Sequence, residues 1–235
     1  MPNRPMLAAD EIHVICASID ASAPRQEELA ALLSSDEQER AARFAFSRDR
    51  DRFVARHGLL REILGRYLRR PAAGLRFSYT KAGKPQVADH PVRFSMAHSD
   101  SVAVFAFTSD KEIGVDVEIV RTIPDLPDLV ESMCSTRELE HWRRLDSERQ
   151  LPAFFDLWSR KEAFLKGTGE GLAKSPNEIE VLAPAPSKNQ KIAVFDRGRE
   201  VRPWSLYSLS TADYAIAVAF KGQPGLILCW ECENQ

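Results

Sequence analysis

The sequence has 235 residues, of which 44% are hydrophobic and 28% are charged, and its formal net charge is −2. This composition predicts a globular protein with a full core, built as one large domain or two small ones. The small net charge argues against a general nucleic-acid-binding protein, and we expect no nucleic-acid partner. No apolar run approaches the roughly 20 residues that a membrane span needs, so we expect no membrane association.

The first ten residues lack the basic segment followed by an apolar segment that marks a secretory signal, so we expect a cytoplasmic location. The four cysteines are too few and too scattered for a disulfide framework: Cys16, Cys134, Cys229 and Cys232. The last two form a lone Cys-x-x-Cys pair without the further ligands of a structural zinc site. We interpret them as reduced thiols on a C-terminal strand.

In chain order, the N-terminal part alternates strands and helices, and Pro71 and Gly74 end the second helix. The predicted elements are a strand over 12–19, a helix over 24–42, an amphipathic helix over 51–68, a strand over 75–80 and a turn over 81–85. Ten arginines lie between positions 40 and 70, against only three acidic residues. This local positive charge suits the phosphates of a small ligand or an acidic partner surface, although a solvated helix face explains many of these arginines equally well.

The rest of the chain predicts short strands around two further helices. The predicted strands cover 94–96, 102–107, 113–119, 178–182, 192–195, 204–209, 214–220 and 226–230, with a polar loop over 97–101. Pro124 and Pro127 mark a loop, Thr136 is the expected cap of a helix running to about Leu145, and a strong helix over 152–166 follows. The order of elements predicts an α+β fold with antiparallel strands.

The strand Gly114-Val115-Asp116-Val117-Glu118 carries two acids on one face. Side chains alternate along a strand, so Asp116 and Glu118 project to the same side, about 7 Å apart. Two such carboxylates favour a cation between them, and Mg²⁺ prefers hard oxygen ligands of this type. On this pair alone, an exposed strand face with two solvated acids is the more common explanation.

A helix carrying Trp158, Lys161, Glu162 and Lys166 runs into a glycine-rich loop. Positions four apart share a helix face, so Glu162 and Lys166 are neighbours. One interpretation is an ordinary surface ion pair between them. The other is that the helix brings a third carboxylate, Glu162, and two ammonium groups, those of Lys161 and Lys166, to a bound phosphate. His98, in Phe94-Ser95-Met96-Ala97-His98-Ser99, is either a turn residue or a hydrogen-bond donor to a phosphate oxygen. We reject a Ser-His-Asp hydrolase, because no Gly-x-Ser-x-Gly elbow is present.

Together, and in this order, these motifs resemble those of the 4′-phosphopantetheinyl transferases, in the long monomeric form that activates surfactin synthetase. The resemblance covers roughly positions 34 to 172 and rests on the following segments: the basic helix with Arg48 and Arg56, Gly83-Lys84-Pro85, Phe94 to Ser99, Gly114 to Glu118, and Trp158 to Lys166. It implies a pseudodimer of two similar α+β halves, residues 1–111 and 112–235, with antiparallel sheets and the active site in the cleft between them.

The resemblance also implies an activity: transfer of phosphopantetheine from coenzyme A to a serine of an apo acyl or peptidyl carrier protein, with release of 3′,5′-ADP. It implies that a magnesium ion, for which Mn²⁺ can substitute, is held by Asp116, Glu118 and Glu162. It assigns His98, Lys161 and Lys166 to the phosphates of coenzyme A. It assigns Arg48, Arg56 and Lys84, beside Pro85, to the 3′-phosphate end.

Among these residues, Glu162 is the candidate general base, directly or through a metal-bound water, and Lys166 would offset the charge on the leaving phosphate. Asp116 is the third residue expected to be catalytic. One departure from the family pattern is Ala97, where many members have serine. Two other readings remain open: a binding module for coenzyme A or a nucleotide that does not transfer, and a magnesium-dependent phosphohydrolase.

Overall fold

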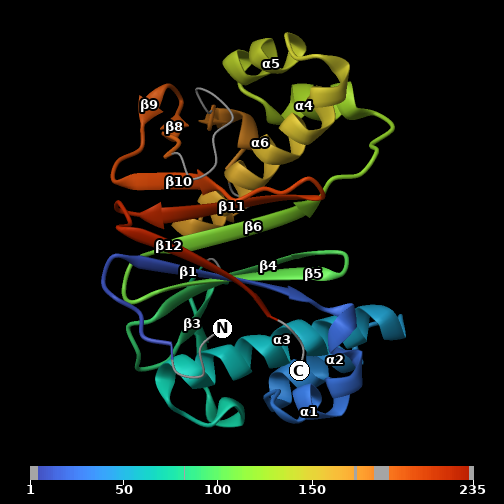
Figure 1. Ribbon diagram of the computed structural model, residues 1–235, viewed down its shortest axis with the longest axis vertical. Helices are drawn as coiled ribbons and strands as arrows, with labels where there is room; N and C mark the ends of the chain where they lie inside the picture. The colour runs from blue at the N-terminus through green and yellow to red at the C-terminus, as the bar shows by residue number, and fades with distance from the viewer. Residues whose placement is uncertain (1–4, 82, 172–173, 183–190, 233–235) are drawn as a thin grey trace.

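The computed structural model describes residues 5–81, 83–171, 174–182 and 191–232. Its main elements form four layers in the order helices, sheet, sheet, helices (Figure 1). The α+β class with antiparallel sheets is therefore confirmed. No helix in the described part of the chain combines the length and apolar character that crossing a bilayer requires.

The first sheet has the strand order β12-β1-β5-β4 and is antiparallel except for the parallel β1–β12 pair. Its strands are β1 (Glu11–Ser18), β4 (Arg93–Ser99), β5 (Val102–Thr108) and β12 (Leu226–Cys232). The helices on its outer face are η1 (Asp20–Arg25), α1 (Gln26–Ala31), α2 (Ser35–Ala42) and α3 (Ser47–Leu68), followed by η2 (Ala72–Gly74). Buried leucines of α3 and its one phenylalanine, Phe53, belong to the same core cluster as residues of this sheet, as the amphipathic pattern predicts.

The second sheet has the order β10-β11-β6 and is fully antiparallel. Its strands are β6 (Ile113–Ile119), β10 (Trp204–Ser208) and β11 (Tyr214–Lys221). The helices on its outer side are α4 (Leu126–Met133), α5 (Thr136–Arg143) and α6 (Ser147–Thr168). Two small sheets complete the fold: β2 (Phe77–Tyr79) with β3 (Pro85–Val87), and β7 (Ile179–Glu180), β8 (Phe195–Asp196) and β9 (Arg199–Glu200), with η4 (Pro176–Glu178) before β7.

An apolar layer joins the inner faces of the two main sheets, and β4 and β6 are linked across it. The Val115 N–H donates a hydrogen bond to Ser95 Oγ at 3.1 Å, and the Ile119 N–H donates to Ser99 Oγ at 3.2 Å. Because of these bonds, the residues of β4 are held in register with the carboxylate-bearing strand β6. The predicted division at Lys111 falls in the turn between β5 and β6, although β12 returns to the first sheet.

Several local predictions differ from the structure. The single helix expected over 24–42 is broken, because Ser34 and Glu37 form a capping box that starts α2 afresh. A second capping box shows that Ser135, rather than Thr136, caps α5. The polar loop expected over 97–101 is shorter, since β4 continues through Ser99, and the turn places Asp100 at a φ of 48°.

A helix also occupies the segment that the two prolines were expected to keep as a loop. Pro127 lies in the first turn of α4, where the missing N–H of proline costs no helical hydrogen bond.

Candidate active site between α3, β4 and α6

Two glycines allow β6 and α6 to touch through their backbones. A Cβ atom added at Gly114 would lie 1.9 Å from the carbonyl oxygen of Ala163 and 2.3 Å from the backbone nitrogen of Gly167, which real contacts do not allow. The glycine is therefore required for this close approach. Its consequence is that side chains farther along both elements, on β6 and on the last turns of α6, meet directly.

Asp116 and Lys166 form the centre of this meeting. Lys166 Nζ lies 2.6 Å from Asp116 Oδ1, and Asp116 is only 3% exposed. Burial, reinforced by the charges of Glu118 and Glu162, raises the pKa of Asp116 to about 7, although Lys166 opposes the change. The other oxygen, Asp116 Oδ2, is buried and has no hydrogen-bond partner among the described residues.

The other two predicted acids lie within electrostatic reach of Asp116. Glu118 is half-buried and accepts a hydrogen bond from Ser99 Oγ at 3.0 Å, and burial raises its pKa. Glu162, one turn before Lys166 on α6, is also half-buried, and its negative charge raises the pKa of both strand acids. The strand acids and the helix acid therefore share one electrostatic environment.

The three carboxylates are ligands of the type that a hard divalent cation prefers, although their side chains do not surround a common point. In the described ranges, no three His, Cys, Asp or Glu side chains are already close enough to hold a metal ion. A buried carboxylate oxygen without a partner is costly, however, unless a cation or a proton occupies it. An all-oxygen donor set with few protein ligands matches Mg²⁺, which keeps waters and substrate phosphates in its shell.

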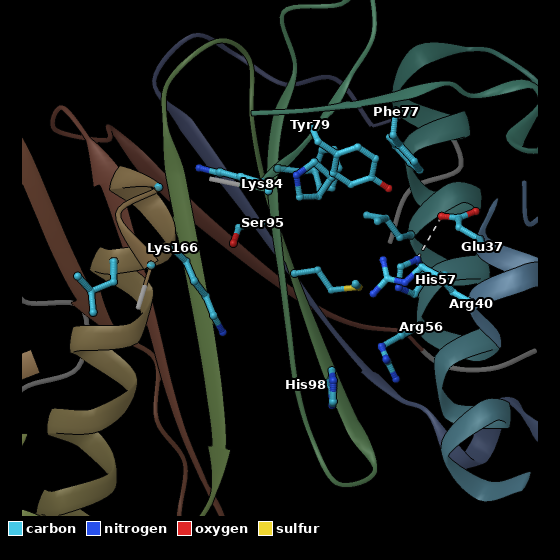
Figure 2. A pocket seen from close by; sticks show the side chains of 18 residues that line it. Glu37, Arg40, Arg56, His57, Phe77, Tyr79, Lys84, Ser95, His98 and Lys166 are labelled. Atoms are coloured by element: carbon cyan, nitrogen blue, oxygen red, sulfur yellow. Dashed lines mark hydrogen bonds and ion pairs between the residues drawn. The ribbon is translucent and has the colours of Figure 1, made fainter. Parts of the chain in front are cut away.

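A cavity of about 400 Å³ reaches from α2 and α3 across β4 to the end of α6 (Figure 2). The three acids are not part of its lining, but Lys166, the partner of Asp116, is. One part of its lining is cationic or imidazole-bearing: Arg40, Arg56, His57, His98 and Lys166. Another part is apolar: Leu60, Phe77, Pro85, Phe94, Met96 and Leu165, with Tyr79 beside them. Such a lining suits a ligand that has both phosphates and a flat or apolar part.

His98 lines the cavity between two of its cationic residues. Figure 2 shows its ring between Lys166 on one side and Arg56 on the other. Burial within the cavity, followed by the charges of Arg56 and Lys166, lowers the pKa of His98 to about 4. The imidazole is therefore neutral at pH 7, and one ring N–H remains able to donate to an oxygen.

Comparisons with known proteins agree with this arrangement. A family model for the 4′-phosphopantetheinyl transferase superfamily matches residues 112–219, and a model for the N-terminal part of a 4′-phosphopantetheinyl transferase matches residues 20–110. The chain is 37% identical over 220 residues to the 4′-phosphopantetheinyl transferase HetI of Nostoc sp., covering 92% of this chain and 89% of that protein. The chain belongs to the 4′-phosphopantetheinyl transferase superfamily.

The chain is also similar to a second 4′-phosphopantetheinyl transferase. It is 30% identical over 153 residues to the 4′-phosphopantetheinyl transferase Sfp of Bacillus subtilis, covering 65% of this chain and 67% of that protein. The predicted resemblance to the surfactin-synthetase-activating type is therefore confirmed. A holo-[acyl-carrier-protein] synthase from Thermotoga maritima has a TM-score of 0.38 at 22% identity, covering 48% of this chain and 63% of that one, which is too distant to place any residue.

Of the residues that the family pattern assigns to coenzyme A, Arg56, Lys84, Pro85, His98 and Lys166 line the cavity. Arg48 does not line it: its side chain is 75% exposed and lies 3.7 Å from Asp49.

The ammonium group of Lys84 is engaged by protein atoms. Lys84 Nζ donates to Glu112 Oε2 at 3.1 Å and to the carbonyl oxygens of Ile113 at 2.7 Å and Gly167 at 3.1 Å. Lys84, directly before β3, therefore ties this segment to β6 and α6, and its ammonium group is directed at protein atoms.

Lys161 requires a correction, because the structure does not bring it to the cavity. The side chain is 0% exposed, and its ammonium nitrogen lies 2.6 Å from the equally buried Glu138. It also donates to the carbonyl oxygens of Pro176, at 2.8 Å, and Ile179. Lys161 thus links α6 to α5, to η4 and to the start of β7, which is a structural role.

We expect Lys161→Met to destabilise the fold by about 3–5 kcal/mol, since it leaves one partner of a buried ion pair behind. Urea unfolding followed by circular dichroism measures the change. The fraction that remains folded should transfer at the wild-type rate per molecule. A stable Lys161→Met protein with no transfer activity would instead support the phosphate contact that the family pattern implies.

The structure adds cavity residues that the sequence did not single out. Arg40 comes from α2, His57 directly follows Arg56 on α3, and Tyr79 lies on β2. His57 Nδ1 donates to Glu37 Oε1 at 3.2 Å. The arginine-rich composition of this segment was a signal for Arg40, but nothing local distinguished it from its exposed neighbours.

The departure at Ala97 lies away from the cavity. Ala97 is buried in the apolar layer between the sheets, while its neighbours Met96 and His98 line the cavity. A serine hydroxyl at this position would point toward β6, so alanine changes the packing between the sheets rather than the cavity lining.

Proposed function

We propose that this chain is a magnesium-dependent phosphopantetheinyl transferase that uses coenzyme A and modifies a serine hydroxyl of an apo acyl or peptidyl carrier protein. The observation that carries the proposal is that the cavity and the buried carboxylate Asp116 share one residue, Lys166. A cation-lined cavity of about 400 Å³ ends at Lys166, and Lys166 pairs with a buried Asp116 whose second oxygen has no partner in the described structure.

Coenzyme A fits both parts of the cavity lining. Its phosphates would lie against Arg40, Arg56 and His98, because guanidinium groups bind phosphate oxygens with charge-assisted hydrogen bonds. Its adenine ring would lie against the apolar part of the lining near Tyr79 and Pro85. Arg48 lies outside this lining, so we assign it no direct contact.

Asp116, Glu118 and Glu162 would hold Mg²⁺ beside the coenzyme A pyrophosphate, and Mn²⁺ could take its place because it also prefers oxygen ligands. When bound, the cation neutralises phosphate charge and polarises the phosphorus toward attack. The raised pKa values of Asp116 and Glu118 agree with a group of carboxylates that is incomplete without positive charge.

The chain's own residues would then move one proton and stabilise one leaving group. Glu162 accepts the proton of the carrier serine, and the serine oxygen attacks the β-phosphorus of coenzyme A. The bond from that phosphorus to the bridging oxygen breaks, and 3′,5′-ADP leaves. Lys166 stabilises the negative charge that grows on the leaving phosphate, and His98 donates a hydrogen bond to a phosphate oxygen.

The two halves of the chain both contribute to this site, which supports the pseudodimer. Each half packs a 22-residue helix, α3 or α6, on the outer face of a sheet, and the cavity is lined from both. We propose the boundary near Lys111, a monomer as the working unit, and a cytoplasmic location with no nucleic-acid or membrane partner.

Mass spectrometry tests the activity. The protein is incubated with coenzyme A, Mg²⁺ and several apo carrier proteins, and in parallel without a carrier. We expect a carrier to gain the mass of phosphopantetheine, and a serine-to-alanine carrier to gain none. Breakdown of coenzyme A without a carrier would indicate a phosphohydrolase, and binding without any product would indicate a binding module.

We expect Arg56→Glu to raise the Kd for coenzyme A at least about tenfold, because a charge that attracts phosphate is replaced by one that repels it. The Mg²⁺ concentration for half-maximal rate should change much less. Calorimetry and a magnesium titration measure the two effects, with the exposed Arg48→Glu as a control. An unaltered affinity for coenzyme A in Arg56→Glu would contradict the assignment.

A further inference from the structure

Phe53 on α3 lies directly behind the cationic part of the cavity. Its ring is 1% exposed and does not line the cavity itself. The guanidinium carbon of Arg56 lies 4.9 Å from the ring centroid, and that of Arg40 lies 5.4 Å from it. The ring of His57 stacks on it at 4.0 Å with an interplanar angle of 24°.

The two arginines repel each other at this place. They come from different helices, and the pKa of Arg56 is lowered to about 10 by burial and then by the charge of Arg40. No carboxylate forms an ion pair with either of them among the described residues, whereas Arg43, Arg48, Arg50 and Arg52 each have at least one. An aromatic face attracts guanidinium groups through its quadrupole, so the Phe53 ring offsets this repulsion.

We propose that Phe53 is a positioning residue that keeps Arg40 and Arg56 directed at the ligand phosphates before the ligand binds. The contact through one shared ring joins α2 to α3 on the side that faces the cavity. Preorganised donors lose less conformational entropy on binding, so the effect belongs to ligand affinity rather than to the chemical step. This inference rests on the proposed function, because it takes the ligand to be a nucleotide that carries phosphates.

The test measures the binding of 3′,5′-ADP by calorimetry and the kinetics of transfer with coenzyme A. Phe53→Leu keeps an apolar side chain but removes the aromatic face. We expect its Kd for 3′,5′-ADP to rise about tenfold, from the loss of two cation–π contacts, and its KM for coenzyme A to rise similarly. The kcat at saturating coenzyme A should stay within about twofold, because the lost contacts contribute equally to the bound substrate and to the transition state.

Two further variants separate this role from simple packing. Phe53→Trp retains an aromatic face and should restore most of the affinity. Phe107→Leu removes a ring from the same core, away from the arginines, and should lower stability without changing the Kd. If Phe53→Leu does not fold, Phe53→Trp against Phe53→Met gives the same comparison of aromatic and aliphatic side chains at this position.

A double-mutant cycle shows whether Phe53 acts through the arginines. With Arg40→Gln and Arg56→Gln both present, Phe53→Leu should add less than about twofold to the Kd, because the groups that it orients are gone. An equal effect in both backgrounds, or an unchanged Kd in Phe53→Leu alone, overturns the proposal while wild-type transfer stands. Absence of both transfer and 3′,5′-ADP binding in the wild type overturns the proposed function itself, and this inference with it.

Discussion

Asp116→Asn is expected to lower the rate of phosphopantetheine transfer at least about 100-fold, since it weakens the binding of the cation that would neutralise charge on the reacting phosphate. The substitution keeps the size of the side chain and a partner for Lys166, which now lies 2.6 Å from Asp116 Oδ1. It removes the negative charge that the proposed cation requires. A radioactive or mass-based transfer assay at saturating coenzyme A and Mg²⁺ measures the loss.

Stability should change in the opposite direction, which separates function from folding. Burial, with the nearby acids, raises the pKa of Asp116 to about 7, so the metal-free folded state pays to ionise this group. The folded state therefore holds a proton that the unfolded state has lost, and stability falls as the pH rises from 3.8 to about 7. Asp116→Asn avoids this loss, so its melting temperature should exceed that of the metal-free wild type most above pH 7. An inactive variant that is also strongly destabilised at pH 8 would speak against the role of Asp116.

Glu162→Gln is expected to lower the rate about 100-fold or more, which is the usual contribution of a general base. The side chain is half-buried on α6, and its charge acts on both strand acids, so the amide should leave the fold intact. Single-turnover kinetics with a saturating carrier protein isolates the chemical step. The matched control is Glu170→Gln, an exposed residue past the end of α6, which should transfer normally. Near-normal turnover by Glu162→Gln would remove it from the mechanism.

The carboxylate strand could be predicted from the sequence because its pattern has a period of two. Ile113, Val115 and Val117 are buried between the sheets, and the alternation therefore turns Asp116 and Glu118 to the other side, toward α6. The spacing of four between Glu162 and Lys166 likewise sets their common helix face. Neither pattern predicts that α6 packs on β6, since this contact depends on the close approach at Gly114.

For Lys161, the family motif predicted a phosphate contact, whereas helical periodicity predicts a buried side chain. It lies four residues after Leu157 and four before Leu165, both of which are buried, so helical periodicity already placed it on the core-facing stripe. The broken helix over 24–42 is similar, because Ser34 and Glu37 have the spacing of a capping box. Periodicity and caps are local signals, and a closer reading of them corrects both predictions.

The cationic lining of the cavity could not be predicted in detail. Arg40 and Arg56 are sixteen positions apart on different helices, and they meet because both pack on Phe53. Many arginines of this segment instead pair with acids at the surface, as Arg52 does with Asp20 and Asp100. Composition therefore indicated a positive region, but only the packing of α2 against α3 decided which charges face a ligand.

A manganese titration followed by electron paramagnetic resonance tests the central claim, that acids from β6 and α6 act on one divalent cation. In the presence of coenzyme A, the wild type should bind one Mn²⁺ per chain. Asp116→Asn, Glu118→Gln and Glu162→Gln should each weaken that binding at least about tenfold, and Glu170→Gln should not. Unchanged Mn²⁺ binding by Glu162→Gln would show that the helix acid does not share the ion, and the proposed site would then be wrong.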